Sequence, residues 1–212
     1  MNKRNTLLSM TINAVIVILE AVAIVLSYRE MKTGMFVYYT VLSNIFLAVS
    51  SLLVCIFSVP VLQGKKDTLP AFVSRVKYMA TCVVTVTFLV VLFILAPTTA
   101  GENPIWKNLL YLLLHGSMLY MHFICPVLAI LSYTAFEKPL PYNRRLPLFA
   151  IIFTLLYAAV LIPLNIAEKV RGPYPFLMVR EQSILASFFW AVAIPGFAYL
   201  IAVGINLASK RR

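Results

Sequence analysis

The chain alternates between long apolar stretches and short polar connections. A helix that crosses the roughly 30 Å core of a bilayer needs about 20 residues at about 1.5 Å each. Six stretches meet this length and therefore predict six membrane-spanning helices, at about Leu7–Tyr28, Met35–Val59, Val76–Ala96, Asn108–Phe136, Pro147–Asn165 and Ser183–Ala208. The connections are too short for another domain, so residues 1–212 are expected to form a single all-α domain.

The composition supports a polytopic membrane protein. Apolar and aromatic residues make up 62% of the chain and charged residues 12%, against about 25% charged residues in soluble domains. A soluble fold of this size could not bury so much apolar surface. The first apolar stretch follows Lys3 and Arg4 as in a signal peptide. Its apolar run is longer than the apolar core of an ordinary signal peptide and no small-residue cleavage site follows it, so we expect it to be retained.

The basic residues predict the orientation of the helices. With the N-terminus inside, the cytoplasmic segments hold 12 of the 18 Lys and Arg residues and the outer segments hold 6. Basic residues favour the cytoplasmic side, so both termini are expected there, in a multi-pass protein of a cell membrane. The cytoplasmic set is Lys3, Arg4, Lys65, Lys66, Arg75, Lys77, Lys138, Arg144, Arg145, Lys210, Arg211 and Arg212. Trp106, Tyr142 and Tyr174 fit interfacial aromatic positions.

Polar residues inside the spans recur at helical spacing. In the first span Thr6, Asn13, Glu20 and Ser27 stand seven residues apart, which places them on nearly one face. Glu20 is the only acidic residue deep in any span. The second span carries polar residues at similar spacing, namely Thr40, Ser43, Asn44, Ser50 and Ser51. Such faces either join helices through hydrogen bonds or line a functional cavity, and the spacing leaves both readings open.

The fourth span holds both histidines of the chain, His115 and His122, seven residues apart. Pro126 follows His122 by four residues, so it removes the amide that would bond the His122 carbonyl and predicts a kink there. A kink beside an intramembrane imidazole favours a functional site over simple packing.

Other kinds of site lack their motifs. The two histidines do not have the spacing of a helical zinc pair, and Cys55, Cys82 and Cys125 are scattered through apolar stretches. The chain has no phosphate-binding loop, dinucleotide fingerprint or nucleophile elbow. We therefore expect no metal, no cofactor and no nucleic-acid partner.

Three segments carry a family resemblance. Residues 36–44, FVYYTVLSN, resemble the aromatic-Thr-x-x-Ser-Asn signature of small bacterial six-helix membrane proteins. Residues 122–126, HFICP, resemble their His-x-x-x-Pro helix, and residues 174–177, YPFL, resemble the segment before their last helix. These bacterial proteins are similar to the animal androgen-induced and androgen-dependent multipass proteins. That family cleaves fatty acid esters of hydroxy fatty acids with an intramembrane threonine and histidine.

The resemblance implies a nucleophile at Thr40 and a base at His122. In the animal proteins the histidine stands one residue farther from its proline, so His115 is the alternative base. An imidazole can take the threonine proton while the hydroxyl attacks an ester, giving an acyl-threonine that water then hydrolyses. From their positions, Asn44 and Ser43 are candidates to stabilise the oxyanion, and Glu20 is a candidate to orient the imidazole.

Depth in the membrane and the proline motif favour different histidines. Counted at about 1.5 Å per residue from the outer ends near Gly34 and Trp106, Thr40 lies about 9 Å deep, His115 about 13 Å and His122 about 24 Å. Depth thus favours His115 as the partner of Thr40, whereas the proline motif favours His122, which we prefer. We also expect a pocket beside Thr40 with apolar walls for acyl chains.

Three classes of function are consistent with these residues. The first is a threonine hydrolase that acts on lipid-like carboxylic esters in contact with membrane lipids. The second is a small transporter or a lipid- or metabolite-binding protein that uses the same polar cavity, and the third is a structural or regulatory membrane subunit. The sequence leaves the natural ester and the oligomeric state open.

Overall fold

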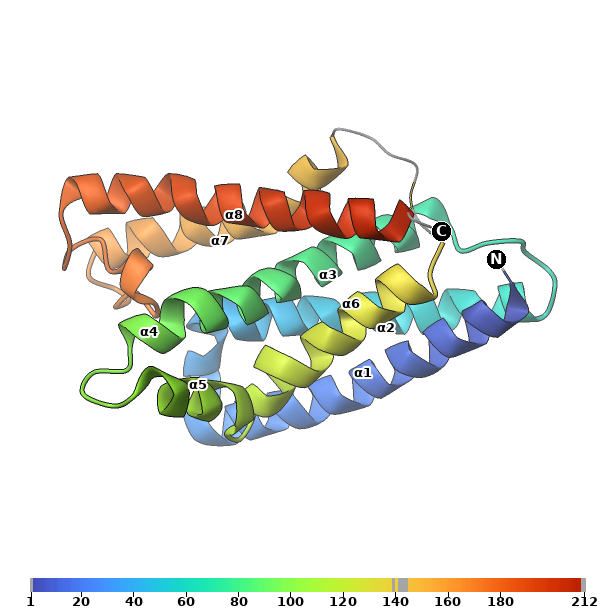
Figure 1. Cartoon of the computed structure of the whole chain (residues 1–212), viewed down its shortest axis with the longest axis horizontal. Helices are drawn as coiled ribbons and strands as arrows, with labels where there is room; N and C mark the ends of the chain where they lie inside the picture. The colour runs from blue at the N-terminus through green and yellow to red at the C-terminus, as the bar shows by residue number, and fades with distance from the viewer. Residues whose placement is uncertain (1, 139, 141–144, 211–212) are drawn as a thin grey trace.

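A computed structural model describes residues 2–138, 140 and 145–210, and within these residues every regular element is helical. The predicted all-α fold is therefore confirmed. Figure 1 shows the long helices as a bundle with both chain termini at one end. The long helices are α1 (Lys3–Met31), α2 (Tyr39–Leu62), α3 (Ala71–Val90), α6 (Cys125–Ala135), α7 (Leu146–Ile166) and α8 (Ile184–Lys210).

Short elements join or extend these helices. A 3₁₀ turn, η1 (Lys32–Val37), connects α1 to α2. A π-turn, η2 (Val91–Leu95), and the short α4 (Ala96–Thr98) extend α3. The helix α5 (Ile105–Leu114) and a π-turn, η3 (Leu119–Ile124), precede α6, and a 3₁₀ turn, η4 (Pro175–Leu177), precedes α8.

Five helices of the described residues are long and apolar enough to cross a membrane, and a bent pair makes up to six. The bent pair joins residues 105–114 to residues 119–135 at an angle of 98°. The chain thus has the architecture of a multi-pass membrane protein. An even number of crossings agrees with the termini lying at the same end of the bundle (Figure 1).

The fourth span differs from its prediction. We expected one helix over residues 108–136 with a kink at Pro126, but the sharp bend falls at residues 115–118. Pro126 instead stands in the first turn of α6, directly after the π-turn η3. Residues 119–135 form one continuous helix, and the wider π-helical turn ahead of Pro126 accommodates the proline ring and its missing amide.

Lys77 was predicted to lie in a cytoplasmic segment, and this placement was wrong. The predicted span already began at Val76, and in the structure α3 begins at Ala71, so Lys77 lies inside the helix and is fully buried. A lysine is usually assigned to a polar connection because a buried ammonium group is costly, but Lys77 donates to Ser51 within the bundle.

The helix α1 directs polar side chains into the bundle and many large apolar side chains outward. On α1 the four predicted polar residues Thr6, Asn13, Glu20 and Ser27 are all fully buried. Large apolar side chains of the same helix are exposed, among them Leu7, Ile18, Val22 and Val25. This arrangement suits a protein surrounded by lipid.

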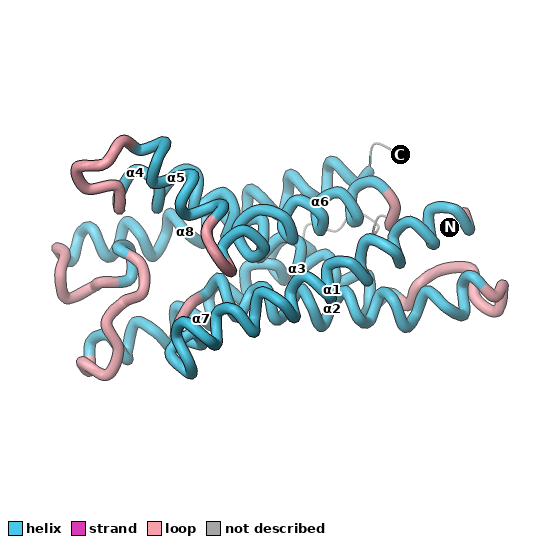
Figure 2. Tube along the Cα trace, turned by 90° about the horizontal axis from the view of Figure 1, so that it is seen from below, coloured by secondary structure: helices cyan, strands magenta, loops and turns pink. Residues whose placement is uncertain are grey.

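The central helix is α3, which packs against α2, α6, α7 and α8. Figure 2 shows the same bundle from a second direction, with α5 at its end. Both views place α5 at the end opposite the termini. Among the predicted interfacial and basic residues, Tyr142, Arg144, Arg211 and Arg212 lie outside the described residues.

Candidate functional site

Thr40 lies in the first turn of α2, at the end of the bundle opposite the termini. The first four amides of a helix have no partner within the helix. The residue before the helix, Tyr38, provides no side-chain cap. The Thr40 amide instead donates to the phenol oxygen of Tyr174 at 3.2 Å.

The structure brings Thr40 and His122 together. The Thr40 Oγ1 and His122 Nε2 atoms lie 3.3 Å apart, and both residues are buried. The other ring nitrogen, Nδ1, lies 2.6 Å from the carbonyl oxygen of Leu112. A carbonyl can only accept, so Nδ1 carries the hydrogen. In the neutral ring Nε2 is then free to accept the hydroxyl hydrogen of Thr40.

The bend before η3 explains how His122 reaches Thr40. The depth estimate of about 24 Å assumed a straight helix from Trp106. Because α5 is bent by 98° from the following helix, the residues before about Leu119 add little depth along that helix. His122 is the fourth residue of η3, and Thr40 is the second residue of α2. Both residues therefore lie near the start of a helical segment. Gly116 makes the turn with a φ of +53°, a conformation that favours glycine.

His115 does not join this site. It follows the last residue of α5, is exposed, and stacks on Tyr111 with ring centroids 4.7 Å apart. The disagreement between depth and motif thus came from the assumed straight helix.

Asn44 and Ser43 lie beside Thr40 but do not point a free hydrogen toward it. The Asn44 amide donates to the carbonyl oxygens of Thr40 at 2.8 Å and Met121 at 3.1 Å. The Ser43 hydroxyl also donates to the Thr40 carbonyl, at 2.9 Å, and lies 3.1 Å from the Thr87 hydroxyl. These two residues therefore hold the start of α2 against η3 and α3.

Glu20 lies elsewhere. Its carboxyl group lies near Cys125 and Lys77, but its two oxygens accept no hydrogen bond from the described residues. The Leu112 carbonyl occupies the orienting position on His122. Glu20 is fully buried. It belongs to a second polar cluster, in which Lys77 donates to Ser51 at 3.0 Å and interacts electrostatically with Glu137.

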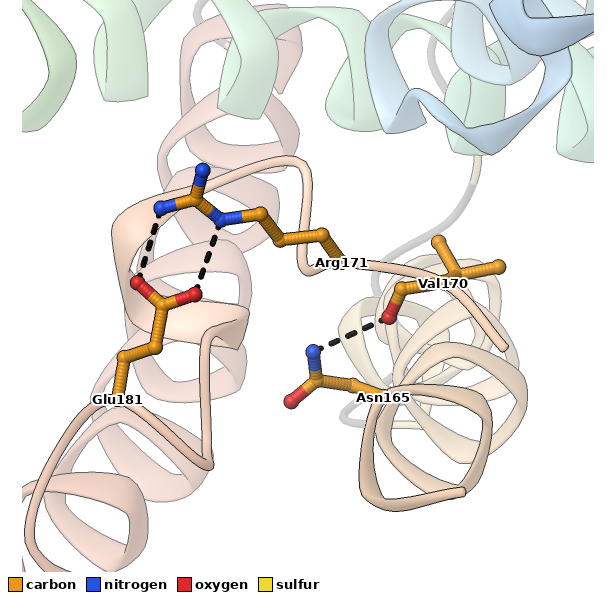
Figure 3. A network of polar contacts seen from close by, with 4 residues as sticks. All are labelled: Asn165, Val170, Arg171 and Glu181. Atoms are coloured by element: carbon orange, nitrogen blue, oxygen red, sulfur yellow. Dashed lines mark hydrogen bonds and ion pairs between the residues drawn. The ribbon is translucent and has the colours of Figure 1, made fainter. Parts of the chain in front are cut away.

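The loop that carries Tyr174 is held by its own contacts. Arg171 forms two hydrogen bonds with Glu181, at 2.9 and 3.0 Å, and Asn165 donates to the Val170 carbonyl at 3.1 Å (Figure 3). The hydrogen bonds from Arg171 lower the pKa of the exposed Glu181 carboxyl group. A Cβ atom at Gly172 would lie 2.5 Å from the Leu177 carbonyl oxygen, so this close approach requires glycine.

Tyr174 itself is buried within the loop. Its ring stacks on Phe176 with centroids 5.2 Å apart and meets Tyr38 edge-on at 6.2 Å. Its Oη atom lies 3.2 Å from Thr40 Oγ1. Burial raises the pKa of Tyr174 to about 12, although the hydrogen bonds with Thr40 act in the opposite direction. The phenol therefore keeps its proton at neutral pH.

A cavity of about 390 Å³ adjoins Thr40. Its walls come from the first turn of α2, the end of α3 with η2, the α7 and α8 helices, and η4. Most of its lining is apolar, for example Val90, Ile162, Trp190 and Ile194. Thr40 and Tyr174 both line it, while His122 approaches Thr40 from η3. Its volume falls within the range of about 300–1,000 Å³ typical of small-molecule sites.

Sequence reasoning gave two members of this site no role. Tyr174 was expected to be an interfacial aromatic, although its YPFL segment was part of the resemblance. The Leu112 carbonyl is a backbone group and leaves no mark in the sequence. The only signal for it is Gly116, because a glycine between two apolar segments can end one helix and start another.

Among the described residues no group of three or more His, Cys, Asp and Glu side chains is arranged to hold a metal ion. Comparison of the chain with models of known protein families, with curated proteins and with solved structures finds no match. The assignment of a function therefore depends on the geometry around Thr40.

Proposed function

We propose that this protein is an intramembrane threonine hydrolase that cleaves lipid-like carboxylic esters. The observation that carries the proposal is the 3.3 Å contact between Thr40 Oγ1 and His122 Nε2. The hydrogen bond from His122 Nδ1 to Leu112 leaves Nε2 as the acceptor. This is the arrangement of a hydroxyl nucleophile with its general base and a group that orients the base.

The reaction proceeds in two stages. The Thr40 oxygen bonds to the ester carbonyl carbon while its proton passes to His122 Nε2. The tetrahedral intermediate then collapses, the bond to the alcohol oxygen breaks, and His122 gives its proton to that alcohol. Water next attacks the acyl-threonine with His122 as base. Loss of the acid restores the Thr40 hydroxyl with the proton from His122.

The cavity is evidence for a substrate that carries an apolar chain. Its apolar walls begin at Thr40 and continue between α7 and α8. An acyl or alkyl chain in that space would bring its ester group to the hydroxyl. The resemblance to the androgen-induced family supports fatty acid esters of hydroxy fatty acids as the first substrates to test. The basic connections support a bacterial plasma membrane as its location.

Two matched pairs of variants test the proposal in purified protein. The chain offers Thr85 as a control for Thr40, because it is a buried threonine that lies outside the cavity lining and donates to the Thr81 carbonyl of its own helix. Thr40→Ala should abolish labelling by a fluorophosphonate probe and turnover of long-chain esters, and Thr85→Ala should keep both. Wild-type labelling and turnover in Thr40→Ala would refute the hydrolase.

The histidines provide the second pair. His122→Ala should lower the rate of ester cleavage by about 10²–10⁴-fold, since it removes the general base. His115→Ala should stay within a few-fold of the wild type, because His115 is exposed and stacks only on Tyr111. Equal losses in the two variants would contradict the role of His122.

A second candidate function is a transporter or a carrier of an apolar metabolite. The observation that favours it is the broken helix of residues 105–135, because discontinuous helices are common at transporter binding sites. Tight binding of an ester or fatty acid that is released unchanged from wild-type protein would favour this candidate over the hydrolase.

A further inference from the structure

The tetrahedral intermediate of the proposed reaction needs a hydrogen-bond donor for its oxyanion. Such a donor acts when it lies about 2.7–3.1 Å from the position of the charged oxygen. The nearby amide of Asn44 and the hydroxyl of Ser43 have their hydrogens directed at backbone carbonyls. Another group beside Thr40 must therefore stabilise the charge.

The phenol of Tyr174 is placed for this role. Its oxygen accepts from the Thr40 amide at 3.2 Å, so its own hydrogen points elsewhere. The Thr40 hydroxyl has one hydrogen, and His122 Nε2 can only accept it. The Tyr174 hydrogen is therefore directed at Thr40 Oγ1, 3.2 Å away.

Attack on an ester keeps the reacting atoms within reach of this hydrogen. Once Thr40 Oγ1 bonds to the carbonyl carbon, the oxyanion sits on that same carbon, two bonds from Oγ1. The Tyr174 hydrogen needs only to turn from Oγ1 to the oxyanion. Since Tyr174 lines the cavity with Thr40, both groups face the space where the ester would lie.

We propose that Tyr174 is a third catalytic residue, which donates the hydrogen bond that stabilises the oxyanion. This inference rests on the proposed hydrolase function. The position of Thr40 in the first turn of the 24-residue helix α2 adds to the effect. The amino-terminal end of a helix favours negative charge, and the oxyanion would form there.

Tyr174→Phe tests the role with the smallest change. The variant keeps the ring that stacks on Phe176 and removes only the hydroxyl. We expect kcat for ester cleavage to fall by about 10²–10³-fold, as on removal of an oxyanion donor. KM should change little, because the hydrogen bond strengthens only in the transition state.

Tyr78→Phe is the matched control. Tyr78 is also buried, donates its hydroxyl to the Ala202 carbonyl at 2.7 Å, and lies outside the lining of the cavity. We expect its kcat to stay within a few-fold of the wild type. Equal losses in the two variants would mean that the bundle needs its buried tyrosine hydroxyls for packing, and would overturn the proposal.

A transition-state analogue separates catalysis from positioning. A long-chain trifluoromethyl ketone forms a charged adduct with the threonine, so its affinity should weaken in Tyr174→Phe by the same factor as kcat/KM. The affinity for an unreactive alkyl ether of the same length should not change. Unchanged affinity for the ketone would overturn the proposal.

Two outcomes distinguish this inference from the function on which it rests. Wild-type kcat in Tyr174→Phe together with an inactive Thr40→Ala removes the role of Tyr174 and leaves the hydrolase. Turnover in Thr40→Ala removes the hydrolase itself. If Tyr174→Phe does not fold, fluorinated tyrosines at position 174 vary the acidity of the phenol without loss of the hydrogen bond. A rate that does not change with this acidity would again overturn the proposal.

Discussion

At the scale of single residues, the hydroxyl of Thr40 belongs to a chain of hydrogen bonds with one direction. Tyr174 donates to Thr40, Thr40 donates to His122, and His122 donates to the Leu112 carbonyl. The direction follows from the carbonyl at the end, which can only accept. Bonds in such a chain polarise one another, so each donor becomes stronger in the buried site.

The pH dependence of the reaction should reflect the proton on Tyr174. An ordinary tyrosine loses its proton near pH 10. Burial disfavours the charged phenolate and raises the pKa of Tyr174 to about 12. The donor therefore remains intact between pH 8 and about pH 10, and we expect kcat for ester cleavage in detergent to stay level across this interval. A fall in kcat centred near pH 10 would mean that the donor has an unshifted pKa.

Asn44 should stabilise the site without taking part in the chemistry. Asn44→Ala removes two buried hydrogen bonds, one to the Thr40 carbonyl within α2 and one to the Met121 carbonyl that joins α2 to η3. We expect a loss of about 1–3 kcal/mol in the free energy of unfolding. Ser50→Ala is the control, because the buried Ser50 hydroxyl bonds only the Leu47 carbonyl of its own helix. Equal losses on chemical unfolding in detergent would contradict the bridging role.

The residues of the site were predictable from the sequence to different degrees. Thr40 and His122 could be named because a short motif surrounds each, and polar residues are rare in a span. The roles of Asn44 and Glu20 could not be predicted, because helical spacing gives the face and the depth of a residue but not the direction of its hydrogen bonds. The contact between the Leu112 carbonyl and His122 depends on the bend of the chain between them, and hydropathy does not predict that bend.

At the scale of elements, the break between α5 and η3 decides which histidine meets Thr40. Hydropathy over residues 108–136 is continuous and predicts one helix, because the residues at the break include no proline and only one glycine. The other long helices were predicted to within about six residues, since each is a single apolar stretch between polar connections. The sequence thus predicts the crossings well and the broken crossing poorly.

Gly116→Ala tests the importance of this break. At a φ of +53° an alanine costs about 1–2 kcal/mol more than glycine. The strain should shift the start of η3 and lengthen the contact between His122 and Thr40. We expect lower stability and a kcat for ester cleavage reduced by at least about 10-fold, since about 1 Å of misplacement can cost still more.

Gly196→Ala is the matched control for that substitution. Gly196 lies within α8, and a Cβ atom there would meet nothing within 4 Å. Alanine is a better helix former than glycine by about 1 kcal/mol, so this variant should be as stable as the wild type or more so. A Gly116→Ala protein with wild-type kcat would show that the bend tolerates a side chain.

At the scale of the whole molecule, the bundle has two separate polar regions in an apolar surround. One is the site around Thr40, at the end opposite the termini. The other joins four parts of the chain, through Glu20 of α1, Ser51 of α2, Lys77 of α3 and Glu137 after α6. This second polar region also contains hydrogen bonds to Glu137, which accepts from Asn13 at 3.3 Å and from Ser132 at 2.9 Å.

The second region should stabilise the bundle through the balance of its charges. The Lys77 ammonium group interacts electrostatically with the buried side chains of Glu137 and, less strongly, Glu20. Removal of one member of a buried charge cluster costs about 3–5 kcal/mol, whereas replacement of all members by neutral groups costs much less. Lys77→Met should therefore lower the unfolding temperature in detergent strongly. Arg75→Met should not, because Arg75 is exposed two residues away on the same helix.

The triple variant Lys77→Met, Glu20→Gln, Glu137→Gln separates charge balance from packing. It keeps the approximate volume of each side chain and removes all three ionisable groups, so it should recover most of the stability that Lys77→Met loses. Ester cleavage should be retained in the folded triple variant, since the residues around Thr40 are unchanged. A triple variant less stable than Lys77→Met would mean that each carboxylate contributes through its own hydrogen bonds, such as those from Asn13 and Ser132 to Glu137, and that Lys77 is not their compensating charge.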